Sequence, residues 1–281
     1  MKKMTFPLNY FSLIFSPVRI FVGRTMLSWG KILFIFIFLN ACLILPVSLY
    51  FAKADSFQLT KVMPDMMELV NQQLVDQLQA YSLNDGVLSG GNGDVVIDSK
   101  DGAAAIILNG TEIPKDENAI IMGKTEMELR DEQGYAFKVK YTNNTDLKNI
   151  ETPVDLSDWI SSQWYIQNKA FLFITMILMT GSILVGSTLM LTLFASLMLW
   201  ATKRSTFSTI ASFKEAINLT VNALGLPTIL AMITGIIYFD VTIIMAVQSL
   251  GMVLMIAFAF FKTRFNHEQA LQILNVEGEI K

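Results

Sequence analysis

Cysteine and histidine are almost absent from this chain of 281 residues, which contains one of each, Cys42 and His267. One cysteine cannot form an internal disulfide, and the pair cannot build a Cys/His zinc cluster or a site that needs two imidazoles. Charge is also scarce: 16% of the residues are charged, 53% are hydrophobic, and the mean hydropathy is +0.48. These values are typical of a membrane protein. The formal net charge of -3 gives no indication of a nucleic-acid partner.

Four stretches are long and apolar enough to cross a bilayer, which takes about 20 residues of helix. They are residues 32–52, 169–202, 216–239 and 241–261. The first contains Pro46, which is expected to kink it. The second is uncharged over more length than one untilted span needs, so we predict one long, tilted helix that projects from the membrane. Only Asp240 separates the third and fourth stretches, which predicts a tight hairpin.

Basic residues lie in every second connection between these spans. They are Lys2, Lys3, Arg19, Arg24 and Lys31, then Lys203, Arg204 and Lys214, then Lys262 and Arg264. Lys and Arg near span ends are retained in the cytoplasm. We therefore expect the leader 1–31, the loop 203–215 and the tail 262–281 to be cytoplasmic. Residues 53–168 would be extracytoplasmic; from Lys53 to Asp158 they hold nine Lys or Arg against nineteen Asp or Glu.

The segment 53–168 reads as a small α+β domain. An apolar stripe from Val62 to Tyr81 has helical spacing and predicts a helix, and its methionines indicate either core or an adaptable binding face. Turn dipeptides such as Asp85-Gly86 then surround short β-type runs. Residues 126–130 and 135–141 predict a hairpin with one buried face. Asp155 to Gln167 predicts an interfacial helix that leads into the second span.

Two interpretations remain open for the N-terminal segments. The leader from Tyr10 to Gly30 is basic, amphipathic and aromatic, which favours a position in the membrane interface over binding of a partner helix. Ala52-Lys53-Ala54 has the small-x-small form of a signal-peptidase site. The preceding apolar stretch is longer than a signal-peptide core, which favours an uncleaved first span over cleavage after Ala54.

The sequence predicts a protein without catalytic activity, metal or cofactor. His267 is expected on the cytoplasmic side, away from most carboxylates, so a Ser/His/Asp triad cannot assemble. The acidic groups Asp94, Asp98 and Asp101, or Asp116 and Glu117, lack the ligand spacing of an EF-hand loop and are better read as solvated turns. No Asp, Glu, Lys or Arg lies at mid-depth in a span, which disfavours a proton-coupled or ion-coupled transporter.

Small and amide residues recur at four-residue spacing within the spans, where they favour close helix packing over a substrate path. The helix-packing candidates are Ser182 and Gly186, Asn218 and Asn222, and Ala231 and Gly235. Carbohydrate contact would use aromatic side chains beside carboxylates or amides. Weak candidates for ligand contact are Trp159, Trp164 and Tyr165, although a belt at the membrane interface also explains them.

Short motifs at both ends of the chain point to a family. Ser16-Pro17-Val18-Arg19, then Arg24, then Gly30-Lys31 at the start of a Phe-rich span resemble the beginning of bacterial maltodextrin-utilisation membrane proteins, a family labelled as of unknown function. The run from Phe213 to Pro227 resembles the polar third span of the same family and of the wider Yip-type group. The order of one span, an outer domain and three spans matches as well.

The resemblance implies a non-enzymatic accessory protein of the bacterial plasma membrane that assists maltodextrin uptake. Its partners would be the lipid bilayer and a sugar-transport complex or another membrane protein. The alternative is a structural or trafficking-like membrane organiser of the Yip type with no link to sugar. The family brings no established catalytic residues to this chain.

The predicted topology is testable by cysteine labelling. A cysteine introduced at Asp116 should react with a membrane-impermeant thiol reagent in intact cells, whereas a cysteine at Ser205 should react only after the cells are opened. The physical reason is the retention of the basic connections on the cytoplasmic side. The reverse labelling pattern would contradict this orientation.

Overall fold

The computed structural model describes residues 5–54, 56–91, 93–110, 113, 118–132, 135–142, 145–205 and 208–279. The chain forms two compact units. We call Met1–Lys53 with Phe173–Lys281 the helical unit, and Ala54–Leu172 the sheet unit. The structure confirms a predominantly helical protein with a small β-sheet region, and four of its described helices are long and apolar enough to cross a membrane.

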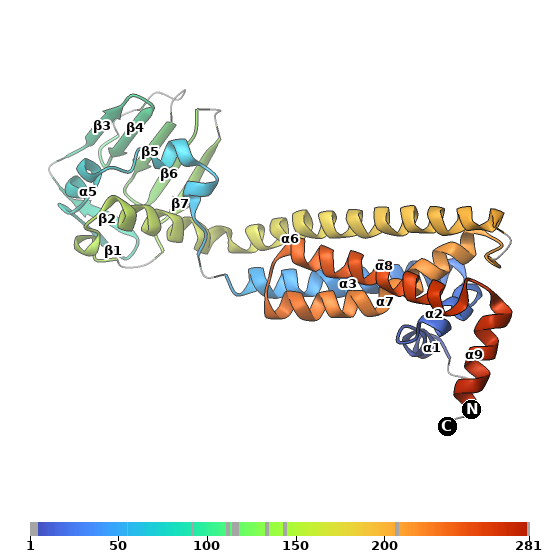
Figure 1. Ribbon diagram of the computed structural model, residues 1–281. Coiled ribbons are helices and arrows are strands. Elements are labelled where there is room, and N and C mark those ends of the chain that lie inside the picture. The colour runs from blue at the N-terminus through green and yellow to red at the C-terminus, as the bar shows by residue number, and fades with distance from the viewer. Residues whose placement is uncertain are drawn as a thin grey trace. The chain divides into compact units, whose positions relative to one another are not determined.

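The helical unit is built from four long helices that lie side by side (Figure 1). They are α3 (Trp29–Ala52), the C-terminal part of α6 (Pro153–Ala201), α7 (Phe213–Ile237) and α8 (Val241–Thr263). Shorter elements are α1 (Leu8–Leu13), α2 (Pro17–Val22), η1 (Gly23–Thr25), η4 (Thr202–Arg204) and α9 (His267–Glu279). The connection between α7 and α8 is as tight as predicted, because Asp240 caps α8 by accepting the Ile243 backbone N–H at 3.0 Å.

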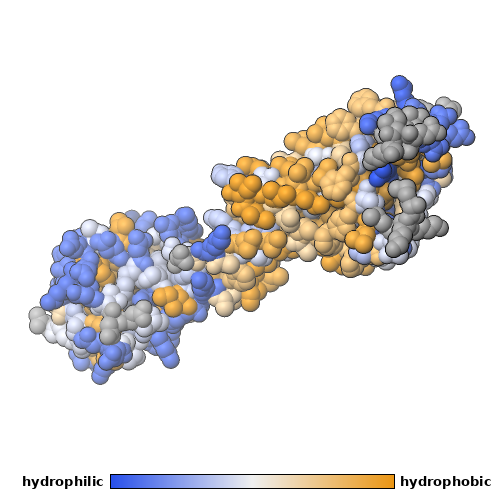
Figure 2. Space-filling model, turned by 90° about the horizontal axis from the view of Figure 1, so that it is seen from below, coloured by the Kyte–Doolittle hydropathy of each residue, from blue (hydrophilic) through white to orange (hydrophobic). Residues whose placement is uncertain are grey.

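On the face shown in Figure 2, hydrophobic residues dominate the greater part of the helical unit, whereas hydrophilic residues dominate the sheet unit. Leu178, Met179, Phe194 and Met198, on the part of α6 that belongs to the helical unit, are more than half exposed. Such an apolar surface is unfavourable in contact with water but not in contact with lipid. The surface therefore supports a membrane location for these helices.

The N-terminal leader packs into the helical unit. Tyr10, Ile14 and Phe21 are fully buried, and the Tyr10 hydroxyl donates to the Val221 carbonyl at 3.0 Å. α7 admits the leader because Gly225 has no side chain: a Cβ there would lie 2.7 Å from the Tyr10 hydroxyl oxygen. These side chains pack against neighbouring helices of the same chain, while the position of the leader in the membrane interface stays a prediction.

The sheet unit contains a five-stranded sheet in the order β3-β4-β5-β6-β7 and a separate hairpin, β1-β2. The bounds are β1 (Tyr81–Asn84), β2 (Val87–Gly90), β3 (Val95–Ser99), β4 (Gly102–Ile106), β5 (Asn118–Met122), β6 (Glu126–Arg130) and β7 (Ala136–Lys140). β4 and β5 pair in parallel and the other neighbours are antiparallel. Asp85 and Gly86, with φ of 49° and 73°, form the predicted turn between β1 and β2.

The predicted hairpin of residues 126–130 and 135–141 is confirmed as β6 and β7. Its buried face is shorter than the alternation indicates: Val139 and Tyr141 are buried, but Tyr135 and Phe137 are 63% and 38% exposed. On β4, Ala103 and Ala105 are buried against Ala119 and Ile113. Small side chains at these positions let Ile113 pack on the sheet.

The single helix predicted over 62–81 is wrong. The structure forms η2 (Leu59–Lys61), α4 (Pro64–Met67) and α5 (Gln72–Leu78), and Tyr81 starts β1. The break is local, because the Asn71 side chain accepts the Leu74 N–H at 2.9 Å and so begins a new helix. Met66, Met67, Leu74 and Leu78 are buried, so this stripe is core.

The predicted interfacial helix and second span are one helix, α6, which begins at Pro153 and ends at Ala201. Leu156 and Ile160 on its N-terminal third are fully buried in the sheet-unit core. The predicted boundary at 168 and 169 therefore falls inside a helix. The reason is that the apolar pattern continues across Lys169 without a proline or glycine that would stop the helix.

Two glutamines of α6 close the edge of the sheet beyond β7. Gln167 accepts the Lys140 N–H at 3.0 Å and donates to the Lys140 carbonyl at 2.7 Å, as a neighbouring strand would. Gln163 is 3% exposed and its Oε1 accepts the N–H and the hydroxyl of Thr142 at 3.0 and 2.9 Å. These bonds satisfy edge groups and fix the strand to α6.

Replacement of Gln163 by Ala should destabilise the sheet unit by about 1–3 kcal/mol, because it removes two hydrogen bonds to Thr142, each worth about 0.5–1.5 kcal/mol. Urea unfolding followed by tryptophan fluorescence would measure the loss. Gln73→Ala on the exposed face of α5 is the matched control and should change stability little. Equal effects of the two replacements would contradict the edge-closing role of Gln163.

Candidate functional site

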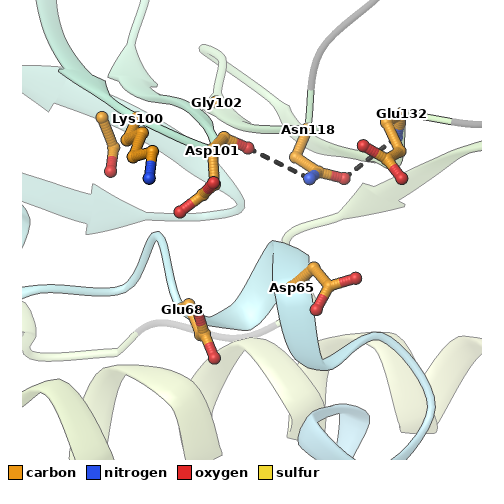
Figure 3. A pocket seen from close by; sticks show the side chains of 8 residues that line it. Asp65, Glu68, Lys100, Asp101, Gly102, Asn118 and Glu132 are labelled. Atoms are coloured by element: carbon orange, nitrogen blue, oxygen red, sulfur yellow. Dashed lines mark hydrogen bonds between the residues drawn. The ribbon is translucent and has the colours of Figure 1, made fainter.

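One hollow in the sheet unit is polar and acidic. It has a volume of about 440 Å³ and is lined by Asp65, Glu68, Ser99, Lys100, Asp101, Gly102, Asn118 and Glu132. Asp65 and Glu68 come from α4 and its end, and face the turn between β3 and β4 together with the start of β5 (Figure 3). A smaller hollow of about 180 Å³ shares Asp65, Asn118 and Glu132. We call these two hollows together the acidic hollow.

Asn118 holds the wall of the acidic hollow in place. It is 4% exposed, its amide donates to the Asp101 carbonyl at 3.0 Å, and its Oδ1 accepts the Glu132 N–H at 2.9 Å (Figure 3). Gly102 has φ of 141° and passes directly over the backbone of Asn118, where a side chain would collide. The three segments that carry Asp101, Asn118 and Glu132 are therefore joined through one amide side chain.

The acidic hollow provides hydrogen-bond acceptors on five carboxylates and a donor on Lys100. Among the described residues no group of three or more His, Cys, Asp or Glu has the geometry to hold a metal ion. Such a lining can hydrogen-bond a ligand rich in hydroxyl groups, or a cationic group. No spacing in the sequence predicts this site, because Asp65, Asp101 and Glu132 come together only through the fold. Asp116 and Glu117 lie outside the described residues.

The aromatic residues considered for ligand contact lie in the interior instead. Trp164 and Tyr165 are 7% and 6% exposed. Trp159 stacks on Tyr141 with ring centroids 6.0 Å apart, and its Nε1 donates to Thr145 at 3.2 Å. Burial raises the pKa of the Tyr141 phenol. Trp164 and Tyr165 therefore belong to the core of the sheet unit and present no open stacking face to a sugar, whereas Trp159 is partly buried and packs against that core.

Four of the six helix-packing candidates are buried, and the other two are exposed. Asn218 and Asn222 are buried and donate to the carbonyls of Leu27 and Ile20 at 3.2 and 3.4 Å, so their partners lie in the leader and not in another long helix. Ala231 is fully buried, and a Cβ on Gly235 would lie 3.0 Å from Pro46. Ser182 and Gly186 are exposed, and no atom lies within 4 Å of a Cβ built on Gly186.

The helical unit contains a buried charged cluster around Arg24. The sequence pattern did not predict it, because Arg24 indicated only the orientation of the first span. Arg24 is 5% exposed, and its Nε donates to Glu215 at 3.2 Å. Its other nitrogens bond Thr209 at 3.3 Å and the Phe21 carbonyl at 3.2 Å, and one lies 3.4 Å from Nδ1 of His267. In the sequence, Glu215 is the one carboxylate between Asp158 and Asp240. This isolated acidic residue is the feature from which an ion pair could have been predicted.

The fold and the site together define a class of membrane protein. Its described part has four apolar helices long enough to cross a membrane, and a sheet unit that carries an acidic hollow. The chain belongs to the family described as "Protein of unknown function (DUF1189)", which it matches over residues 14–262. It is 34% identical over 251 residues to YvdJ of Bacillus subtilis, which is named for maltodextrin utilization, with 85% of this chain and 83% of that protein covered. It is 25% identical over 272 residues to the maltodextrose utilization protein MalA of Streptococcus pneumoniae, with 93% and 97% covered. No solved structure matches.

Replacement of both Asn218 and Asn222 by Leu should change thermal stability only mildly. Hydrogen bonds of this kind contribute about 0.6 kcal/mol on average in membranes. Their buried Oδ1 atoms also find no partner among the described residues, so the replacement removes a cost as well as two bonds. The melting temperature of the purified protein in detergent measures the effect. Lost function at normal thermal stability would contradict a packing role and indicate a path or binding site.

Proposed function

We propose that this protein is a non-enzymatic accessory protein of the bacterial plasma membrane that acts in maltodextrin uptake or utilisation. The names of two relatives, each matched over more than four fifths of its length, carry the sugar link. In this proposal both termini are cytoplasmic and the sheet unit is extracytoplasmic. The protein acts by contact, with a sugar-transport complex or another membrane protein as its partner.

The acidic hollow is the place where we propose that the sheet unit meets the sugar. Its volume lies within the range usual for small-molecule sites. Carboxylates accept hydrogen bonds from the hydroxyl groups of a sugar, and the Lys100 ammonium group can donate to the sugar oxygens. In the helical unit, by contrast, buried polar side chains already bond one another: Gln248 joins Thr228 at 3.1 Å and Thr188 at 3.2 Å. Those residues support packing better than they support a sugar path.

Deletion of the gene should slow growth on maltodextrins and leave growth on glucose intact. Complementation with Asp101→Asn together with Glu132→Gln should restore growth poorly, because these replacements remove acceptor charge from the hollow at nearly constant shape. Asp98→Asn, an exposed carboxylate on β3 outside the hollow, is the matched control and should complement. His267→Ala should complement as well, since no catalytic role is proposed for it.

Growth curves with immunoblots of membrane levels measure these outcomes. Equal growth of the deletion strain on both sugars would reject the maltodextrin role and leave the membrane-organiser hypothesis. Full complementation by the hollow variant would keep the role but reject the hollow as the sugar contact. Turnover of a maltodextrin by the purified protein would contradict the non-enzymatic proposal.

A further inference from the structure

The helical unit has a groove between the ends of α3 and α7. Its volume is about 370 Å³, and the residues that shape it are Pro46, Leu49, Tyr50, Lys53, Ile236 and Tyr238. Leu49 and Ile236 are 41% and 50% exposed, so the walls of the groove are apolar and open. No part of the proposed sugar role uses this groove.

Close helix packing forms the floor of the groove. A Cβ on Gly235 would lie 3.0 Å from the Pro46 Cβ and 2.7 Å from the Ile244 side chain, so α3 and α7 touch at this level. Toward the helix ends Tyr50 stacks on Phe239 with ring centroids 4.0 Å apart, which fixes the aromatic wall. The groove therefore depends on packed residues rather than on a loose surface.

One end of the groove carries a positive charge. Lys53 is exposed at the C-cap of α3, directly after the uncharged run 32–52, and it is the one charged residue among the described lining residues. Its ammonium group follows the hydrophobic span, at the level where lipid phosphates lie. Tyr50 and Tyr238 place amphipathic rings at the same end, as aromatic residues do in a headgroup region. The Asp240 carboxylate is engaged in capping α8 and does not line the groove.

We infer that this groove is a binding site for one phospholipid with an anionic headgroup. An acyl chain lies along Pro46, Leu49 and Ile236, and the headgroup phosphate lies against Lys53. The charge of Lys53 makes an anionic lipid the preferred occupant over a zwitterionic one, because a zwitterionic headgroup carries, beside its phosphate, a cation that the Lys53 ammonium group repels.

Native mass spectrometry of the full chain in detergent tests this site with two probes, phosphatidylglycerol and phosphatidylcholine. The natural chain should retain phosphatidylglycerol several-fold better. Lys53→Gln should remove most of that preference, whereas Lys262→Gln, an exposed lysine at the far end of α8, should leave it unchanged. Leu49→Trp, which fills the groove, should lower the retention of both lipids at an unchanged melting temperature.

Equal retention of the two lipids by the natural chain would overturn the inference. So would an unchanged preference in Lys53→Gln, or undiminished retention in Leu49→Trp. A loss of preference in Lys262→Gln as large as that in Lys53→Gln would mean that net charge, and not the groove, selects the lipid.

Discussion

The packing of the helical unit depends on the neutralisation of one buried charge, that of Arg24. Burial lowers the pKa of the Arg24 guanidinium, and the adjacent Glu215 carboxylate opposes this shift. An arginine stays charged in a protein, so it needs partners wherever it is buried. Glu215 supplies the opposite charge, while Thr209 and the Phe21 carbonyl accept further hydrogen bonds. The guanidinium carbon also lies 4.2 Å from the centre of the Phe21 ring.

This cluster joins segments that are far apart in the sequence. Glu215 lies in the first turn of α7, where Ser212 caps the helix by accepting the Glu215 N–H and Glu215 accepts the Ala211 N–H. Thr209 donates twice to the Phe265 carbonyl in the turn between α8 and α9, where Arg264 and Phe265 have positive φ. The ion pair thus holds the leader at the start of α7, next to a turn that these hydrogen bonds keep in an unusual conformation.

Composition and charge pattern were sufficient to predict four apolar helices, the tight turn at Asp240 and the hairpin of β6 and β7. Long-range polar contacts were not predictable in this way. From the sequence, Arg24 indicates only a cytoplasmic flank, because its partner Glu215 is distant along the chain. Asn222 likewise indicates a contact between spans, whereas in the structure it bonds the leader, which packs on α7. The acidic hollow has the same origin, because Asn118 bridges Asp101 and Glu132 only after β4 and β5 pair in parallel. Periodicity reports which face of an element is buried, but not what covers it.

The chain passes between the two units at two places, after Lys53 and after Leu172. Within the sheet unit these two segments are bonded together, because the Tyr165 hydroxyl on α6 donates to the Ala54 carbonyl. Gln163 and Gln167 fix the same part of α6 to the edge strand β7. A change in the sheet that moves β7 must therefore strain these bonds or move α6, and α6 continues without a break into the helical unit. If the sheet unit binds a sugar, this helix is the continuous structural element through which binding can reach the membrane helices.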